Sequence, residues 1–166
     1  MPKMRELTPV NADFALIGPN QNTLRQPIAV SAATLFKCLA DGPAWKEWLG
    51  IDVKWTTPEP HGVGTTRTIT TAGQTIEEHF LTWDEGERFA FRFDRCTLPL
   101  QAFAEHYECV SRGDADCELE WSYAFEWGGP LTPVFGRAFG AGFALQGKRA
   151  LKKLAQLLEA DPQRFA

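Results

Sequence analysis

The spacing of apolar residues changes twice along this chain, from helical to alternating and back to helical. A short extended run at 24–30 comes first. Apolar residues between 32 and 39 then recur at helical spacing behind Ser31, a residue type that caps helices. A second, shorter helical turn is predicted over 45–49, where Gly50 ends it. One strand followed by two small helices therefore begins the folded part of the chain.

From residue 51 onward the apolar period is two, which is the period of half-buried strands. Turn-forming Pro, Gly and Asp residues separate the alternating runs. The predicted strands cover residues 51–55, 65–71, 74–83, 89–93, 101–110 and 117–127. Six strands in succession predict an antiparallel meander, and the run at 24–30 brings the sheet to about seven strands.

After Gly128-Gly129-Pro130 the period is helical again. The helix could run for ~25 residues, or about 37 Å at 1.5 Å per residue, which is long enough to cross the whole sheet. Its apolar stripe consists of Phe135, Phe139, Phe143, Gly147, Leu151, Leu154 and Leu158. The predicted fold class is therefore α+β, with a curved antiparallel sheet wrapped around a long C-terminal helix.

Four glycines interrupt this predicted helix, at positions 136, 140, 142 and 147. Each costs ~1 kcal/mol relative to alanine in a helix interior, so their number needs a reason. Two reasons fit the sequence equally well. The glycines let the helix pack closely against the sheet, or they leave space beside a ligand.

The length of 166 residues corresponds to one domain. Residues 1–22 lack either period and are expected to form an N-terminal arm that lies on the surface or adds an edge strand. Residues 23–160 are expected to form the single domain, and residues 161–166 a C-terminal tail. The oligomeric state, monomer or dimer, stays open.

Composition and charge narrow the class of partner. Hydrophobic residues make up 44% of the chain, which is enough for a packed core. Seventeen basic and 21 acidic residues give a net charge of −4, which repels a phosphate backbone, so no nucleic acid partner is expected. Neither an export signal nor a stretch of ~20 apolar residues is visible, and we expect a cytoplasmic location.

The cysteines, histidines and serines of the chain do not have the spacings that are typical of metal sites or catalytic nucleophiles. The cysteines form no CxxC pair and are expected to be reduced, without a disulfide or a zinc site. No histidine has a Cys or His neighbour at ligand spacing, and no serine lies in a Gly-x-Ser-x-Gly elbow. The residues concerned are Cys38, Cys96, Cys109, Cys117, His61, His79 and His106. We therefore predict no metal site and require no cofactor.

Strand parity predicts which side chains of the last hairpin face inward. The bulky residues of both strands are odd-numbered, and cross-strand partners share a face of the sheet. A three-residue loop at 112–114 would pair Cys109 with Cys117, Tyr107 with Leu119, Glu105 with Trp121, and Phe103 with Tyr123. Glu105 would then point inward among aromatic rings.

Parity leaves the preceding hairpin open. Phe89, Phe91 and Phe93 face inward because they alternate with polar residues. A two-residue turn at 85–86 would place Glu78 and Phe80 on the same face. A three-residue turn with a bulge would instead bring His79 and Leu81 inward.

Four segments carry a resemblance to a known family. They are Trp45-Lys46-Glu47-Trp48, Gly62-Val63-Gly64-Thr65-Thr66-Arg67, Glu78-His79-Phe80-Leu81-Thr82-Trp83-Asp84 and Gly147-Lys148-Arg149-Ala150-Leu151-Lys152-Lys153-Leu154. With these segments and this element order, residues 24–159 resemble the helix-grip (START-like, SRPBCC) superfamily. That superfamily includes StAR-related lipid-transfer domains, birch-pollen-type allergens and bacterial polyketide cyclase/dehydrase-like proteins.

The resemblance implies a cavity between the curved sheet and the long helix, which relatives use for sterols, polyketides, plant hormones, quinones or other apolar molecules. The segment around Glu78 is similar to that of plant abscisic-acid receptors, in which the matching glutamate faces the ligand, and this favours Glu78 over His79. The segments that match the gate loops of those receptors, 71–74 and 94–100, lack the gate signature. A hormone-type switch is therefore not expected.

Glu78 and Glu105 are the candidate catalytic residues, since a carboxylate among aromatic rings is costly unless it is paired or protonated. The plain alternative is that a partner such as Arg67 or a buried water neutralises one of them, or that the strand register places it at the rim. The predicted ligand-binding residues are Trp55, Glu78, Phe80, Phe91, Phe93, Phe103, Glu105, Tyr107, Trp121, Tyr123, Phe125, Phe139 and Phe143. Glu78, Glu105 and Tyr123 are expected to orient the polar end of the ligand.

Three functions compete at this point. The first is binding, transport or sensing of a small, mostly hydrophobic molecule such as a lipid, polyketide, quinone or aromatic metabolite. The second is a cyclase or dehydratase that uses a buried glutamate as acid or base. The third is a protein-interaction module of the chaperone-activator type. A filled interior and an exposed apolar patch would favour this function.

The basic cluster at 148–153 suggests one further partner. Positive charge suits the C-terminal half of a helix, where it meets the dipole, and the plain interpretation is a solvated face. With exposed tryptophans near Trp45 and Trp48, the cluster would permit transient contact with a membrane.

Overall fold

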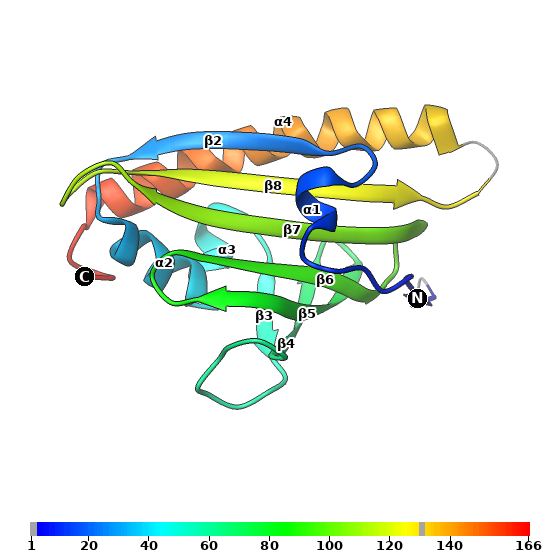
Figure 1. Cartoon of the computed structure of the whole chain (residues 1–166), viewed down its shortest axis with the longest axis horizontal. Coiled ribbons are helices and arrows are strands. Elements are labelled where there is room, and N and C mark those ends of the chain that lie inside the picture. Colours follow the sequence, from blue (N-terminus) through cyan, green and yellow to red (C-terminus); the bar gives the residue numbers. More distant parts are fainter. Residues whose placement is uncertain (1–2, 130–131) are drawn as a thin grey trace.

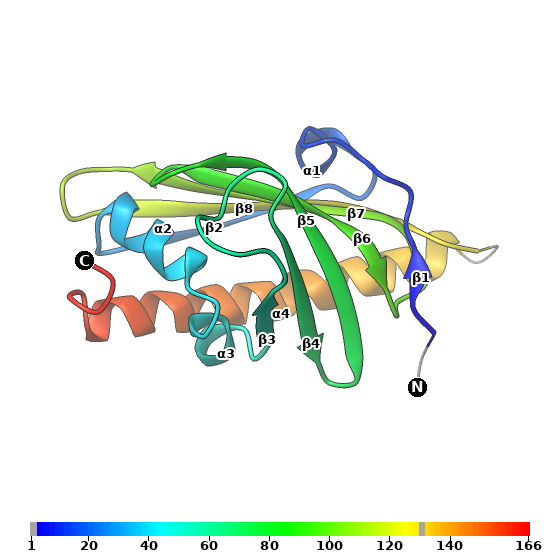
Figure 2. The ribbon, with the colours of Figure 1, turned by 90° about the horizontal axis from the view of Figure 1, so that it is seen from below.

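The computed structural model describes residues 3–129 and 132–166, so the point directly after Pro130, where the helical pattern was predicted to begin, lies outside the described residues. Its sheet is antiparallel, in the order β2-β8-β7-β6-β5-β4-β3, and β1 pairs with β6. The long helix α4 crosses one face of this sheet, and the sheet bends around it (Figures 1 and 2). The predicted α+β helix-grip architecture is confirmed.

The predicted elements are present, with two further short ones near the N-terminus. In chain order they are β1 (Arg5–Glu6), α1 (Phe14–Ile17), β2 (Asn22–Ile28), α2 (Ala32–Ala40), α3 (Ala44–Trp48), β3 (Asp52–Trp55), β4 (Thr66–Thr71), β5 (Gln74–Asp84), β6 (Arg88–Cys96), β7 (Leu100–Ser111), β8 (Cys117–Trp127) and α4 (Thr132–Ala160). The side chain of Ser31 caps α2 as expected, since its Oγ accepts a hydrogen bond from the backbone N–H of Thr34 at 3.1 Å.

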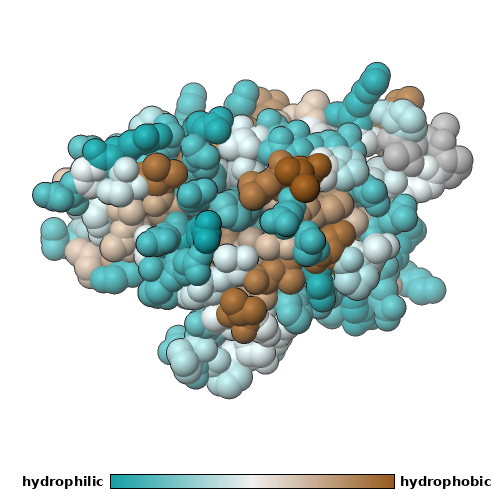
Figure 3. All heavy atoms as spheres, in the orientation of Figure 1, coloured by the Kyte–Doolittle hydropathy of each residue, from teal (hydrophilic) through white to brown (hydrophobic). Residues whose placement is uncertain are grey.

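The N-terminal segment lies within the sheet, where β6 and β7 diverge. These two strands pair only over residues 88–92 and 104–108. Beyond that stretch, the N–H of Leu7 donates to the carbonyl of Asp94 at 2.9 Å, and the N–H of Thr8 donates to the carbonyl of Gln101 at 2.8 Å. Helix α1 then packs over β7 and β8 on the face opposite α4 (Figure 2). Leu16 and Ile17 are exposed there, and apolar side chains gather on this face in Figure 3.

The register of the last hairpin differs by two residues from the prediction. Cys109 lies opposite Leu119, and Cys117 lies opposite Ser111. The parity is as expected, because a shift of two residues keeps every side chain on its face. The connection spans residues 112–116 instead of the three-residue loop, which moves the partner of Glu105 from Trp121 to Tyr123.

The hairpin of β5 and β6 combines the two predicted alternatives. Its turn has three residues but covers 85–87, one residue beyond the predicted end at Gly86, and it is closed by the N–H of Glu87 donating to the carbonyl of Asp84 at 3.0 Å. A bulge at Leu81 then shifts the register back, so that Glu78 lies opposite Phe93. The carboxyl group of Glu78 is therefore buried on the inner face of the sheet, whereas His79 is partly exposed on the outer face.

Helix α4 buries its stripe only from Phe139 onward. Phe135, which was predicted to belong to the stripe, is 50% exposed and lies in the first turn of the helix. Leu151, Leu154 and Leu158 are fully buried. The C-terminal residues also contact the domain: Arg164 pairs with Glu47 on α3 at 2.5 Å.

The tryptophans near the basic cluster are buried, contrary to the expectation that they are exposed. Trp45 and Trp48 are each 1% exposed, because α3 turns them under α4 and against one another, with ring centroids 4.7 Å apart. Trp45 also donates from its indole N–H to the carbonyl of Leu39 at 2.8 Å. Neither ring is available to a membrane surface. Over the described residues, no helix has the length and apolar character needed to cross a membrane.

Candidate functional site

A cavity of about 270 Å³ lies between the sheet and α4. Helix α3, strands β4 to β8 and helix α4 all contribute to it. Its lining residues are Trp45, Leu49, Ile51, Ile69, Thr71, Ala72, Gln74, Ile76, Glu78, Phe91, Phe93, Leu98, Phe103, Glu105, Trp121, Phe139, Phe143, Gln146 and Gly147. The volume is near the lower end of the ~300–1,000 Å³ typical of small-molecule sites, so the cavity suits a compact ligand.

The cavity has a mouth and a closed end. Ala72 on the β4–β5 turn and Gln146 on α4 line it and are exposed, whereas Trp121 and Glu105 line it and are buried. At the mouth, the hydroxyl of Thr97 donates to Oε1 of Gln74 at 2.5 Å. That bond ties the β4–β5 turn to the loop before β7, so the two segments form one rim.

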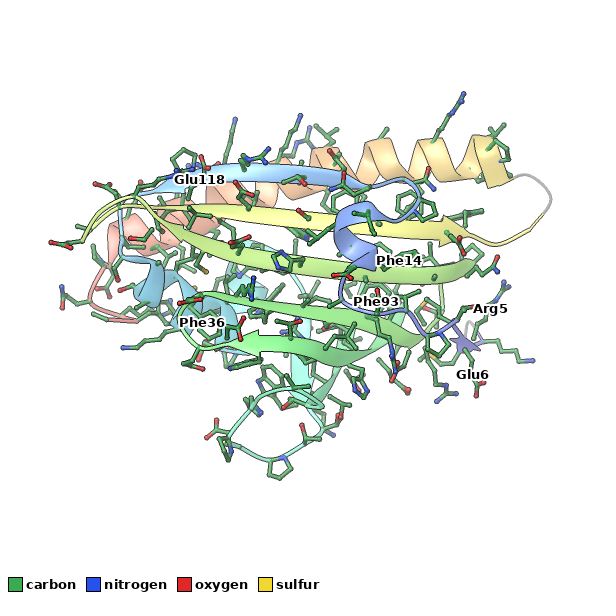
Figure 4. All side chains as sticks on the ribbon, in the orientation of Figure 1. Arg5, Glu6, Phe14, Phe36, Phe93 and Glu118 are labelled. Carbon is green, nitrogen blue, oxygen red and sulfur yellow. The ribbon has the colours of Figure 1, made fainter. Side chains whose placement is uncertain are left out.

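Seven of the 19 described residues that line the cavity are aromatic, and their rings meet at defined angles. Phe93, labelled in Figure 4, stacks on Phe103 with ring centroids 4.2 Å apart. Phe143 on α4 meets Phe103 edge-on at 5.6 Å and meets Tyr123 edge-on at 4.7 Å. These contacts join the rings along the wall and leave the volume in front of them unfilled.

Glu105 is the polar group at the closed end. Its Oε2 accepts two hydrogen bonds, from the phenol of Tyr107 at 2.6 Å and from the indole N–H of Trp121 at 2.9 Å. Burial raises the pKa of Glu105 to about 8, and the nearby charge of Glu78 adds to the rise, although the two hydrogen bonds and Arg67 oppose it. A carboxyl group with such a pKa keeps its proton at neutral pH.

Glu78, the second carboxyl group of the cavity, is paired. Arg67 lies directly across from it on β4, and its Nε donates to Oε2 of Glu78 at 2.5 Å. Burial raises the pKa of Glu78, while the guanidinium of Arg67 opposes that rise. Arginine keeps its proton in proteins, so Glu78 supplies the counter-charge that this buried cation requires.

Aromatic faces enclose the guanidinium of Arg67 as well. Its Cζ lies 4.4 Å from the ring centroid of Trp45 and 4.9 Å from that of Phe91. Its Nη1 and Nη2 are buried and, within the described part of the chain, form no hydrogen bond. The expectation that Arg67 neutralises one of the two carboxyl groups therefore matches the geometry.

The structure brings eight of the thirteen predicted ligand-binding residues to the cavity wall. They are Glu78, Phe91, Phe93, Phe103, Glu105, Trp121, Phe139 and Phe143. The residues away from the wall are Trp55, Phe80, Tyr107, Tyr123 and Phe125. Trp55 and Phe80 pack around Arg67, and Phe125 packs on Phe139. Tyr107 supports Glu105, whereas the Tyr123 hydroxyl accepts a hydrogen bond from Asn22 at 3.0 Å, outside the cavity.

Sequence reasoning missed the aliphatic and mouth residues of the wall. Ile69 and Arg67 are two residues apart and both point to the buried face of β4. The alternation of the strand could therefore have identified Ile69 as a wall residue. Trp45 could be found only by knowing that α3 turns inward. Gly147 was singled out for its cost, and the structure shows close packing at that position. An added Cβ would lie 2.6 Å from Leu24 Cδ1, and the residue also lines the cavity.

The described residues contain no group of three or more His, Cys, Asp or Glu that could hold a metal ion. His106 lies on the outer face of β7 but is only 7% exposed, and burial lowers its pKa. His79 lies 3.4 Å from a carboxylate oxygen of Asp94, also outside the cavity. The titratable groups at the cavity wall are therefore the two glutamates.

Fold and cavity together define a helix-grip protein with an internal pocket. The chain belongs to the polyketide cyclase/dehydrase and lipid transport family, whose model matches residues 22–159. The predicted superfamily and its polyketide cyclase-like branch are thereby confirmed.

The chain is also similar to curated proteins over part of its length. Two uncharacterised proteins, of Mycobacterium tuberculosis and Mycobacterium bovis, are each 40% identical over 111 residues. The match covers 64% of this chain and 66% of theirs, slightly under two thirds of their length.

Two solved structures are similar in fold. The ZhuI aromatase/cyclase of Streptomyces matches with a TM-score of 0.71 at 13% identity, over 87% of this chain and 96% of that one. A START superfamily protein of Mycobacterium smegmatis matches with a TM-score of 0.69 at 15% identity, over 84% and 97%. At these identities the likeness concerns the fold alone.

Proposed function

We propose that the protein binds a small, mostly hydrophobic molecule in the cavity under α4. The observation that carries this proposal is a volume of about 270 Å³ walled by aromatic and aliphatic side chains, with Glu105 at the closed end. A packed protein core has few voids larger than a water molecule, so a cavity of this size favours a binding site over a packing defect. The family description, which includes lipid transport, points the same way.

The apolar walls supply a large part of the free energy that binding requires. Covering ~300 Å² of apolar ligand surface at about 25 cal/mol per Å² yields roughly 7 kcal/mol before association costs. Micromolar binding corresponds to about 8 kcal/mol net, so the polar contacts at the closed end have to supply the difference and offset the cost of association. We propose that Glu105 and Glu78 supply these contacts and orient the polar end of the ligand.

The rim suggests how the ligand enters. Ala72, Leu98 and Gln146 line the mouth from three different elements and are not buried. The four cysteines of the chain are free and buried, which supports a reducing compartment such as the cytoplasm as the place where this binding occurs.

Ligand extraction tests the proposal directly. The purified protein is analysed by native mass spectrometry and by solvent extraction, and is then titrated with 1,8-anilinonaphthalene sulfonate, an apolar fluorescent probe. Ile76→Phe enlarges a wall residue and should lower probe binding severalfold. Val63→Phe adds the same ring at an exposed loop position away from the wall and serves as the control. The proposal is wrong if the protein carries no apolar compound and both variants bind the probe as the wild type does.

Proton-transfer catalysis is a second candidate, favoured by the different states of the two carboxyl groups. Glu78 is paired with a cation, whereas Glu105 keeps its proton, and such a pair can supply a base and an acid to one substrate. The cyclase/dehydrase part of the family description agrees with it. Glu78→Gln and Glu105→Gln should each abolish turnover of an enolisable ketide while binding persists. Absence of turnover by the wild-type protein on any such ketide would speak against catalysis.

A further inference from the structure

We propose that Glu105 presents the hydroxyl of an un-ionised carboxylic acid to the cavity, so that the ligand is a mostly apolar molecule with a carbonyl-type oxygen that accepts this hydrogen bond. This inference rests on the proposed binding function and adds the chemical class of the ligand.

The hydrogen bonds of Glu105 fix where its proton lies. Tyr107 and Trp121 both donate to Oε2, at 2.6 and 2.9 Å. A proton on that same oxygen would meet two other hydrogens, so the neutral acid carries its proton on Oε1. Among the described residues no hydrogen bond reaches Oε1, and Glu105 forms part of the cavity wall. The remaining donor of the group is therefore available to a ligand.

The charge balance of the interior agrees with a neutral Glu105. One cation, Arg67, is buried beside the cavity, and Glu78 cancels its charge. A second carboxylate at Glu105 would add an uncompensated negative charge in an apolar enclosure, which is costly. Burial and the charge of Glu78 both raise the pKa of Glu105, which favours the neutral acid.

Within the described parts of the neighbouring elements, no further charge changes this balance. The charged and titratable groups around Glu105 are Arg67 on β4, Glu78 on β5, Tyr107 on β7 and Tyr123 on β8. Burial raises the pKa of both tyrosines, so they stay neutral. Of the described cavity-lining residues, α3 contributes Trp45, and α4 contributes Phe139, Phe143, Gln146 and Gly147, none of them charged.

A neutral acid and a carboxylate select different ligands. The O–H of the acid donates to a ketone, quinone or similar oxygen, and an apolar surface around it strengthens that bond. A carboxylate would instead attract an ammonium group and repel the carbonyl oxygen. Three probes with one ring skeleton separate these possibilities: 1-tetralone with a carbonyl, tetralin with no polar group, and 1-aminotetralin with an ammonium group.

Calorimetric titration of the full chain at pH 6 and pH 9 tests the inference. At pH 6 we expect 1-tetralone to bind roughly three- to tenfold more tightly than tetralin, the worth of one net hydrogen bond. At pH 9 the acid is ionised, and this preference should disappear. Glu105→Gln holds an N–H donor where the acid holds its O–H, so the variant should prefer 1-tetralone at both pH values. Glu105→Leu has no hydrogen-bond donor at this position and should bind 1-tetralone and tetralin equally at both pH values.

Glu108→Gln is the matched control, because Glu108 is on the same strand with its side chain on the outer face and should keep the wild-type pH response. Equal binding of 1-tetralone and tetralin at pH 6, a preference that persists at pH 9 in the wild type, or tightest binding of 1-aminotetralin would each overturn the inference. In these cases tetralin still binds and the cavity proposal stands. If none of the three probes binds, the proposed function fails as well.

Discussion

The guanidinium of Arg67 and the carboxylate of Glu78 form an ion pair inside the protein, at cross-strand positions of β4 and β5. Their side chains are 0% and 5% exposed, so water screens the pair very little. Removing one partner leaves the other charge buried alone, which costs more than the pair contributes. The pair thus joins two strands of the cavity wall, and we expect replacement of either residue alone to be destabilising.

We expect Arg67→Met to lower the free energy of unfolding by about 3–5 kcal/mol, because Glu78 is left without a counter-charge. The double variant Arg67→Met, Glu78→Leu replaces the pair by apolar groups and should recover most of this loss. Urea unfolding of the wild type, both single variants and the double variant measures the coupling. A double variant no more stable than Arg67→Met would show that the two residues act independently.

The raised pKa of Glu105 makes stability fall as pH rises. Below pH 4.5 the carboxyl group is protonated in the folded and the unfolded chain. Between 4.5 and about 8 only the folded chain keeps the proton, so unfolding becomes progressively easier. Above about 8 both states are ionised and this contribution no longer changes. Over the window the loss amounts to roughly 5 kcal/mol, at 1.36 kcal/mol per pH unit.

Urea unfolding between pH 5 and pH 9 measures this contribution as the difference between the wild type and Glu105→Gln. The glutamine does not titrate, so the variant should lack the part of the slope that Glu105 causes. Glu108→Gln serves as the control and should retain the slope. Parallel curves for the wild type and Glu105→Gln would mean that Glu105 is ionised in the folded protein.

Alternating residues predicted the inward faces of the strands but not their register. Parity places Glu105 and Trp121 on one face in either register, because a two-residue shift changes no side chain's face. The two-residue difference in the last hairpin therefore had no signal in the apolar pattern. In the β5–β6 hairpin, a bulge at Leu81 compensates for the three-residue turn, and parity alone could not distinguish Glu78 from His79.

The cavity was harder to predict than the sheet. An inward aromatic residue such as Phe103 or Tyr123 gives the same pattern whether its ring meets another ring or an open volume. The outcome depends on how far α4 stands from the sheet and on what α3 inserts. Trp45 was expected to be exposed, yet tertiary packing buries it in the cavity wall.

The four cysteines should be unreactive in the folded protein. Thiolates, not thiols, react with disulfide reagents, and burial raises the pKa of Cys38 to about 12 and that of Cys117 to about 11. Burial also raises the pKa values of Cys96 and Cys109. At pH 8, 5,5′-dithiobis(2-nitrobenzoic acid) should label no thiol before unfolding and all four in denaturant. Rapid labelling of any cysteine in the folded protein would contradict this burial.

The glycines of α4 should respond to alanine in opposite ways. At Gly142 an added Cβ meets nothing within 4 Å, so Gly142→Ala should raise the free energy of unfolding by up to ~1 kcal/mol through helix propensity. At Gly147 the same Cβ would lie 2.6 Å from Leu24 and 3.1 Å from Trp121. Overpacking of this kind costs about 1–3 kcal/mol, so Gly147→Ala should be destabilising.

The same pair of variants distinguishes packing from ligand space. Gly147 and Trp121 both line the cavity, so moving the Trp121 ring away from an added Cβ reduces the volume open to a ligand. Gly147→Ala should therefore weaken binding of an apolar probe severalfold, whereas Gly142→Ala, at an exposed position outside the wall, should bind it as the wild type does. If Gly147→Ala is destabilised but binds the probe normally, this glycine serves helix packing alone, and the cavity lies farther from α4 than its lining indicates.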